Sequence, residues 1–391
     1  MKRKSCFLTD SLFSVGGVQR VTAVIARAMA EEAHVTIVTF DTPQSQDRSL
    51  YGLDGADITY RFFGYPVLPA WKRLVCKAYS ALYRKMRLPW RWASDFYAHS
   101  SFPSPLRRAL ASELRQGGYD VIVGVHAPLA VRLATIAPRL PGVKAVGWIH
   151  NSFEALFGPG STYIGPELTR HYVFQLMKLD HTIVLCQHDA DAYQLFDPRC
   201  HPTVIYNPLT LQPGVPSKGT SRQFLAVGRF TPRHKGFDLL IKAFAIFARN
   251  DDLWTLHIVG EGPEESLYRR LIVDNGLEQR VFLHPFTQDI QRYYSEAQVY
   301  VLSSRWEGFG LVLVEAMAHG LPVVSSNLPT SLEIMGDEAL YFENGNVQQL
   351  AVRLHDATLI DWPQASHRAL EAVRRFNIGS IREQWKQVLL R

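Results

Sequence analysis

Cysteine is scarce in this chain of 391 residues, which has four cysteines and no C-x-x-C pair. A structural zinc site or a disulfide framework is therefore not expected, and the pattern fits a reducing cytoplasm. No stretch approaches the roughly 20 apolar residues that cross a bilayer. The short apolar run near the start ends at Asp10, which predicts a first β-strand and not a signal peptide. Zinc, calcium and P-loop motifs are also missing, so we expect no metal and no bound cofactor.

Acidic residues are scarce in one segment, Arg61–Phe102, which has eight lysines and arginines but a single acid, Asp95. Aromatic residues are interleaved with these cations. Such a composition is typical of nucleic-acid binding, of contact with an anionic membrane, or of an amphipathic helix whose aromatic residues belong to the core. Because no nucleic-acid-binding motif occurs elsewhere, we expect no nucleic-acid partner, and membrane contact is the preferred functional interpretation.

Short apolar segments alternate with helical patterns along the whole chain, which predicts parallel sheets joined by crossover helices. A length prior of roughly 150 residues per domain indicates two or three folding units. The expected strands of the first half are Ser5–Thr9, His34–Phe40, Ile58–Phe62, Val121–Val125, Ala145–Ile149, Thr182–Leu185 and Thr203–Ile205. Those of the second half are Phe224–Val227, Leu256–Val259, Val281–Leu283, Val299–Leu302, Val323–Ser325 and Leu340–Phe342.

The stretch Asn207–Ser221 between the two halves is rich in Pro, Gly and Ser, which predicts an interdomain linker. We therefore expect an α/β protein with two doubly wound, Rossmann-like domains that face each other across a cleft. The expected parts are a first domain over 1–206, a linker over 207–222, a second domain over 223–375 and a C-terminal helical segment over 376–391.

Two loops that follow expected strands have the composition of anion sites. In the first half, Gly16 and Gly17 precede a helix, where their backbone can approach a phosphate closely or form a plain turn. In the second half, Arg229 and Lys235 lie between a strand and a helix. They can clamp a diphosphate, or they can be solvated surface cations.

Two acids, Glu307 and Glu315, lie eight residues apart around a Gly-Phe-Gly turn. The pattern places the first carboxylate on a loop and the second in the helix that follows. The N-terminus of such a helix has unpaired backbone N–H groups and suits a phosphate. A ligand with both phosphates and hydroxyls, such as a nucleotide sugar, would use both features.

Several motifs occur in a fixed order: GRF…KG at Gly228–Gly236, IVGEGP at Ile258–Pro263 and EGFGLVLVEAMAHGLPVV at Glu307–Val324, with the GG loop and VIYNP at Val204–Pro208 before them. Together they resemble the family 4 glycosyltransferases, which are retaining enzymes of the two-Rossmann-domain GT-B fold. The resemblance implies an acceptor-binding first domain, a donor-binding second domain and a C-terminal helix that crosses back to the first.

The resemblance also implies roles for single residues. Arg229 and Lys235 would bind the donor diphosphate, Glu315 the ribose hydroxyls and Glu307 the hydroxyls of the donor sugar. His150 resembles the active-site histidine of the family, near the transferring sugar, so the catalytic residues expected are His150 and Glu307. The residues expected beside the diphosphate through their backbone are Gly16, Gly17, Phe309, Gly310 and Leu311.

The sequence departs from the family pattern at SSNLPTSLEI, where the turn before Glu333 lacks glycine. Asp189-Ala190-Asp191 spells a D-x-D, the metal-binding signature of a different glycosyltransferase fold. The two acids lie at an expected helix start, where the helix dipole favours negative charge. Metal binding is therefore not expected. His126 also ends a strand, and a satisfied buried histidine is the preferred interpretation.

The function expected from these features is retaining transfer of a hexose-type sugar from a nucleotide-diphosphate sugar to a glycan or lipid-linked acceptor. The pathway expected is the synthesis of cell-surface polysaccharide or lipopolysaccharide. The expected location is cytoplasmic, with peripheral contact between residues 61–102 and the inner membrane face. Two alternatives stay open: a non-catalytic nucleotide-sugar-binding protein, and a nucleotide-sugar epimerase on the same scaffold.

Overall fold

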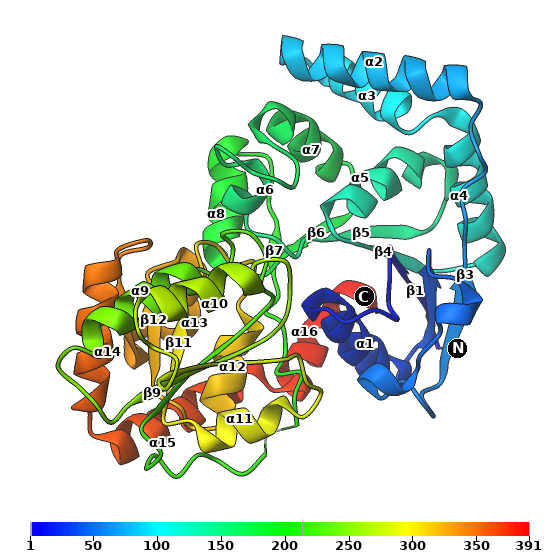
Figure 1. Cartoon of the computed structure of the whole chain (residues 1–391). Coiled ribbons are helices and arrows are strands. Elements are labelled where there is room, and N and C mark those ends of the chain that lie inside the picture. Colours follow the sequence, from blue (N-terminus) through cyan, green and yellow to red (C-terminus); the bar gives the residue numbers. More distant parts are fainter. Residues whose placement is uncertain (1, 213, 391) are drawn as a thin grey trace. The chain divides into compact units, whose positions relative to one another are not determined.

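The computed structural model describes residues 2–212 and 214–390 (Figure 1). Its contacts divide the chain into two compact units. Unit 1 contains the residues up to Pro208 together with the segment from Ile378 onward, and unit 2 is Leu209–Asn377. Among the described residues, no helix combines the length and the apolar character needed to cross a membrane.

Unit 1 is built on a parallel sheet of seven strands in the order β3-β2-β1-β4-β5-β6-β7. The strand order reverses between β1 and β4, so the loops after these two strands lie at the position where α/β sheets usually bind ligands. The strands are β1 Lys4–Thr9, β2 His34–Thr39, β3 Ile58–Phe62, β4 Val121–Val125, β5 Lys144–Trp148, β6 His181–Val184 and β7 Thr203–Val204. The helices are α1 Gly17–Ala30, α2 Ala70–Met86, α3 Arg91–Ser101, α4 Ser104–Gly117, α5 Ala127–Ile136, α6 Phe153–Phe157, α7 Thr169–Leu176, α8 Gln187–Phe196 and α16 Ile378–Leu389.

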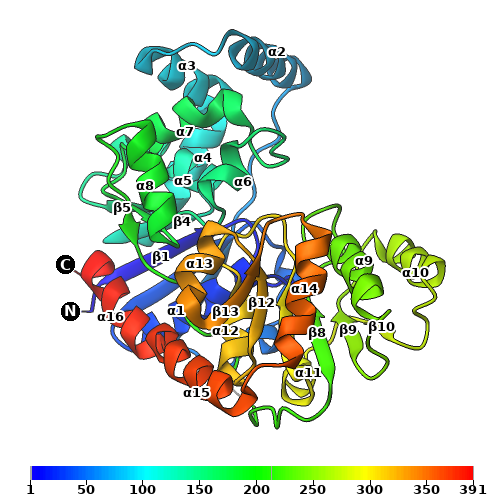
Figure 2. The same cartoon turned by 90° about the vertical axis from the view of Figure 1, so that its left-hand side faces the viewer.

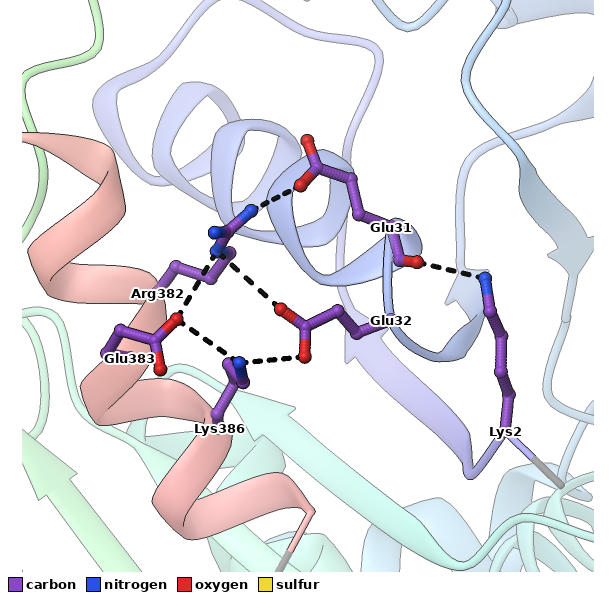
Figure 3. A network of polar contacts seen from close by, with 6 residues as sticks. All are labelled: Lys2, Glu31, Glu32, Arg382, Glu383 and Lys386. Carbon is purple, nitrogen blue, oxygen red and sulfur yellow. Dashed lines mark hydrogen bonds and ion pairs between the residues drawn. The ribbon is translucent and has the colours of Figure 1, made fainter.

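The last helix, α16, belongs to unit 1 although it follows unit 2 in the sequence. Its Trp385 is fully buried, with ring centroids 4.6 Å from Trp148 and 6.0 Å from Phe7. Ion pairs at the end of α1 reinforce this packing (Figure 3): Arg382 pairs with Glu31 and Glu32, and Lys386 lies 2.8 Å from Glu32. The helix therefore completes the core of unit 1.

Unit 2 is built on a parallel sheet of six strands in the order β10-β9-β8-β11-β12-β13. Its strand order reverses between β8 and β11, so the loops after these strands also meet at one edge. The strands are β8 Gln223–Val227, β9 Thr255–Val259, β10 Val281–His284, β11 Val299–Leu302, β12 Val323–Ser326 and β13 Ala339–Phe342. The helices are α9 Phe237–Phe247, α10 Glu265–Asp274, α11 Ile290–Glu296, α12 Leu311–Ala318, α13 Pro329–Met335, α14 Val347–Thr358 and α15 Trp362–Ala372.

The predicted fold class, α/β with two doubly wound parallel sheets, is confirmed. The expected linker over 207–222 forms no helix or strand within its described residues. From Leu209 onward it hydrogen-bonds to unit 2: the Leu209 amide donates to the Phe376 carbonyl, and the Ser217 amide to that of His319. The assignment of unit 1 to the acceptor and unit 2 to the donor stays a prediction.

The segment Arg61–Phe102 is not a single amphipathic helix but a strand end followed by α2 and α3. Some of its aromatic residues, Tyr83, Tyr97 and Phe102, lie in the core as one interpretation predicted. The tryptophans do not, and large apolar side chains of α2 and α3 are exposed. In Figures 1 and 2, α2 and α3 lie together at the outer margin of unit 1.

Candidate active site

In unit 2, the loop after β8 is fastened to the loop after β11. Gly236 has the left-handed φ of 64°, and a Cβ there would lie 2.0 Å from the Ser303 carbonyl oxygen. Only glycine therefore permits this approach. The Ser303 hydroxyl in turn donates to the Lys235 carbonyl at 2.8 Å. The two loops hold each other in place at the edge where the strand order reverses.

Lys235 and Glu307 form a buried ion pair across these loops. Lys235 Nζ lies 2.7 Å from Glu307 Oε1, and the two side chains are 14% and 8% exposed. The Ser304 hydroxyl donates to the same carboxylate oxygen at 2.6 Å. Burial alone would raise the pKa of Glu307, but the charges of Lys235 and His234 and the hydrogen bonds from Lys235 and Ser304 together outweigh it, and the pKa lies below its ordinary value. A cation and an anion are thus placed together in a buried position.

Arg305 braces the β8 loop from the β11 loop. Its amide donates to the His234 carbonyl at 2.8 Å, and its guanidinium forms two bonds of 2.9 and 2.8 Å with Asp238 in the first turn of α9. The His234 ring stacks on Trp306, with centroids 4.9 Å apart and planes 9° apart. The residues on both sides of the Lys235–Glu307 pair are therefore fixed.

The Gly260–Pro263 loop supports the same structure from the other side. The Phe230 amide donates to the Glu261 carbonyl at 2.8 Å, and a Cβ on Gly260 would lie 1.9 Å from the Gly228 carbonyl oxygen. This loop therefore holds the backbone around Arg229, whose side chain is exposed. Its glycines serve close backbone packing.

Glu315 lies one turn into α12 and is 2% exposed. The Tyr294 hydroxyl, from α11, donates to Glu315 Oε2 at 2.9 Å. His319, whose Nδ1 lies 2.8 Å from the Glu315 carbonyl oxygen, stacks on the Tyr294 ring. Gly310 precedes the helix with a φ of 82°, and the neighbouring Phe309 is buried. Sequence reasoning did not find Tyr294 or His319, because nothing in their local pattern distinguishes them from ordinary helix residues.

In unit 1, the loop that contains Gly16 is organised by Asp41, which follows β2. One Asp41 oxygen accepts from the Leu12 amide at 2.6 Å and from the Phe13 amide at 3.2 Å, and the other accepts from the Ser11 hydroxyl at 2.9 Å. The Gly16 amide itself donates to the Tyr51 hydroxyl at 2.9 Å. Gly17 is exposed as the first residue of α1. Asp41 was also missed, although its place at the end of a strand was a usable signal.

His150 lies just after β5 and is 6% exposed, and its Nε2 has no hydrogen-bond partner among the described residues. Burial, with a smaller contribution from His126, holds the pKa of His150 well below its ordinary value, so the ring is neutral at pH 7. The His126 ring lies 5.4 Å from His150. His126 is only half-buried and has a φ of 74°, a strained conformation for a residue with a side chain. Burial lowers the pKa of His126, and its interpretation as a satisfied buried histidine stays a prediction.

Asp189 and Asp191 have separate surroundings in the first turns of α8. Asp189 is buried and accepts from the Phe153 amide at 2.8 Å, while Asp191 accepts from Gln187 at 2.7 Å. Burial raises the pKa of Asp189 to about 6. This geometry gives the D-x-D pattern a structural explanation within unit 1.

Comparison with known proteins identifies the family. Residues 15–212 match Glycosyltransferase Family 4, and residues 210–374 match Glycosyl transferases group 1. The chain belongs to glycosyltransferase family 4. This family 4 glycosyltransferase is 26% identical over 397 residues to an uncharacterized glycosyltransferase of Haemophilus influenzae, with 99% of this chain and 100% of the relative covered.

Two further proteins are similar to this glycosyltransferase, one over part of its sequence and one in its fold. It is 34% identical over 184 residues to the O-antigen chain mannosyltransferase RfbU of Salmonella typhimurium, which covers 46% of this chain and 50% of that protein. It shares its fold with the Anabaena protein HepE, crystallised with UDP and glucose, at a TM-score of 0.74 and 21% identity, with 99% of each chain covered. The chain thus spans about half the length of the mannosyltransferase, and the HepE likeness concerns the fold.

Proposed function

We propose that this glycosyltransferase transfers a hexose, with retention of configuration, from a nucleoside diphosphate sugar to a glycan or lipid-linked acceptor. The observation that carries the proposal is the buried Lys235–Glu307 pair at the edge of the unit 2 sheet. It offers a cation for a diphosphate and an anion for sugar hydroxyls within one site. Glu315, held by Tyr294 one turn into α12, offers a second anion for the ribose.

The proposed donor site assigns each residue one task. Arg229 and Lys235 neutralise the diphosphate, and the backbone of Phe309, Gly310 and Leu311 meets it at the start of α12. Glu307 accepts hydrogen bonds from the sugar hydroxyls. On unit 1, the loop with Gly16 and Gly17 would border the diphosphate and the acceptor, and the neutral His150 ring would contact the transferring sugar.

In the proposed reaction, the bond between the anomeric carbon and the diphosphate oxygen breaks, and its electron pair leaves on the diphosphate. The acceptor hydroxyl oxygen forms the new bond on the same face of the sugar, and its proton passes to the departing phosphate oxygen. The leaving group gains negative charge, which preorganised cations and helix N–H groups stabilise. We therefore expect activity without a metal ion, and unchanged rates in a chelator would agree with this.

The proposed acceptor is a glycan or a lipid-linked glycan. The likeness to an O-antigen mannosyltransferase supports a role in cell-surface polysaccharide or lipopolysaccharide synthesis. Acceptors in such pathways are often carried on lipids. We therefore propose that the enzyme acts in the cytoplasm, at the inner face of the membrane.

Donor screening tests the proposed function. The whole chain is incubated with UDP-, GDP-, ADP- and dTDP-linked hexoses, and release of the nucleoside diphosphate is measured with and without a lipid-linked acceptor pool. We expect one donor class to be consumed, and the product anomer, read from NMR couplings, to match the donor anomer. Glu307→Gln should lower turnover by about a hundredfold or more, because a positioned charge near the reacting sugar is lost. Glu278→Gln, an exposed residue of the same unit, is the matched control.

The outcomes separate the alternatives. Tight donor binding without any release or transfer would favour a non-catalytic nucleotide-sugar-binding protein. Interconversion of donor sugars without release would favour an epimerase. Transfer with inverted configuration would refute the retaining route while leaving the donor site intact.

A further inference from the structure

The helix α2 is almost unburied for its length. Of its 17 residues only Tyr83 is buried. Its exposed side chains include large apolar ones, with Trp71 62% and Leu74 68% exposed. Monomeric proteins rarely leave such a contiguous apolar face in water, so it points to an interaction.

The exposed apolar residues of α2 follow helical periodicity. Trp71, Val75, Leu82 and Met86 are separated by four, seven and four residues, which places them on one face. Tyr79 and Tyr83 lie to one side of this face. The helix therefore presents a continuous apolar stripe along its length.

The stripe continues onto α3. Phe96 is exposed and lies edge-on against Tyr79 of α2, with ring centroids 4.6 Å apart. The exposed Trp90 and Trp92 stack with centroids 5.6 Å apart and planes 10° apart. We call this set the α2–α3 surface. Its members are Trp71, Leu74, Val75, Leu82, Met86, Trp90, Trp92 and Phe96.

The α2–α3 surface stands on a firm base. Tyr83 stacks on the buried Tyr97 of α3, with centroids 4.3 Å apart. Ser94 on the buried side of α3 lies 2.9 Å from the His171 ring nitrogen of α7. These contacts pack α2 against α3, and α3 against α7 of unit 1, beneath the exposed residues.

The positive charge around the α2–α3 surface favours an anionic binding partner. Residues 61–102 carry eight lysines and arginines against one acid, and two of these cations, Arg61 and Arg84, pair with Glu113 and Glu167 outside the segment. Lys72 and Lys85 are placed on opposite flanks of the α2 stripe by helical spacing. A second copy of the chain would bring equal positive charge against this face, which disfavours self-association. A nucleic acid would leave the aliphatic residues exposed.

We propose that the α2–α3 surface docks on an anionic lipid bilayer, with its apolar side chains in the interfacial layer and its cations on the lipid phosphates. Tryptophan rings, aliphatic side chains and flanking lysines match the layers of such an interface. The proposal deepens the proposed function by naming the surface that brings the enzyme to a lipid-linked acceptor.

Vesicle co-sedimentation of the whole chain tests docking without any donor or acceptor. We expect binding to vesicles of phosphatidylcholine mixed with phosphatidylglycerol and much weaker binding to phosphatidylcholine alone. Raising the salt from about 0.05 M to about 0.5 M should weaken the binding, because the Debye length shrinks. Replacing Lys72 and Lys85 with Gln should reduce partitioning by on the order of tenfold, whereas K218Q/K242Q should not.

A matched pair of double variants tests the apolar part. V75E/L82E places two acids in the stripe, at side chains 60% and 52% exposed. V273E/L359E makes the same two changes in unit 2, at side chains 59% and 72% exposed. Both change the net charge equally and neither fills a core position. Only V75E/L82E should lose vesicle binding, by about tenfold or more.

The results are decisive in either direction. Equal loss in the two double variants, or equal binding to neutral and anionic vesicles, would overturn the proposal. A concentration-dependent dimer that V75E/L82E abolishes would assign the surface to a second copy instead. Donor release by V75E/L82E should equal that of the wild type. An enzyme that binds vesicles but releases no nucleotide would instead count against the proposed function alone.

Discussion

Replacement of Lys235 by Met should destabilise unit 2, because the buried Glu307 carboxylate loses its cationic partner. In the wild type, Nζ lies 2.7 Å from Glu307 Oε1, and the Ser304 hydroxyl donates to the same oxygen at 2.6 Å. Removing one partner of a buried ion pair costs about 3–5 kcal/mol, because the other charge stays buried without compensation. Lys235 is 14% exposed and Ser304 remains, so we expect the lower end, about 3 kcal/mol.

Hydrogen exchange measures this cost locally, which avoids treating the two units as one cooperative system. Peptides that cover β11 and α12 report the opening of unit 2. A loss of about 3 kcal/mol corresponds to protection factors lower by about 150-fold. Lys218→Met, at an exposed position of the same unit, is the control and should change protection little. The double variant K235M/E307Q should recover part of the loss, because the unpaired charge is gone.

The pH dependence has a definite sign. The wild-type pKa of Glu307 is lowered, so its contribution to stability is present above the unfolded pKa and disappears as the pH falls through the folded pKa. Without Lys235, we expect burial to raise the pKa of this carboxyl. Protonation then removes the buried, unpaired charge of K235M as the pH falls from 7 toward 5. The deficit of K235M should therefore shrink in that range. A deficit that grows, or one no larger than that of K218M, would refute the reasoning.

Three further outcomes are expected. Gly236→Ala should destabilise unit 2 by well over the roughly 1 kcal/mol of Gly276→Ala, measured by the same exchange assay, because both have a φ of 64° but only Gly236 faces a backbone oxygen. Equal costs would contradict the close approach. Tyr294→Phe removes the donor to Glu315 and should weaken nucleotide binding by calorimetry about tenfold, consistent with roughly 1–3 kcal/mol for a bond to a buried charge. An unchanged affinity would contradict the proposal that Glu315 binds the nucleotide. The His150 ring should stay neutral in carbon-13 NMR as the pH falls below 6.5, the ordinary pKa of histidine, because burial lowers its pKa, and a titration near pH 6.5 would disagree.

Local pattern was sufficient to predict the sheets. The strands expected at Ile58–Phe62, Val121–Val125 and Val299–Leu302 have the same bounds in the structure. Val121–Val125 and Val299–Leu302 are short apolar runs, as burial on both sides of a parallel sheet requires, whereas Ile58–Phe62 is a partly buried edge strand. The helix boundaries in residues 61–102 were harder to predict from the sequence, because Pro89 is the main local signal that separates α2 from α3.

The sequence predicted several residues of the candidate site, but not the hydrogen bonds and ion pairs between them. Lys235 and Glu307 were both expected to bind parts of one ligand, yet their mutual ion pair joins positions 72 residues apart. Asp41 organises amides 28 and 29 residues away, and Tyr294 reaches Glu315 from another helix. Such contacts depend on which strand ends become neighbours, which the spacing of residues along the chain does not encode.

The placement of α16 has a consequence for biosynthesis. During translation, the first 208 residues emerge before unit 2, but the helix that covers Trp148 and Phe7 emerges after it. Domains usually fold as units in the order of synthesis, whereas unit 1 is incomplete, with an apolar surface still exposed, until the segment from Ile378 onward has emerged. A nascent chain stalled before Ile378 should therefore hold a folded unit 2 and an incomplete unit 1, and this intermediate is the natural client for a chaperone on the ribosome.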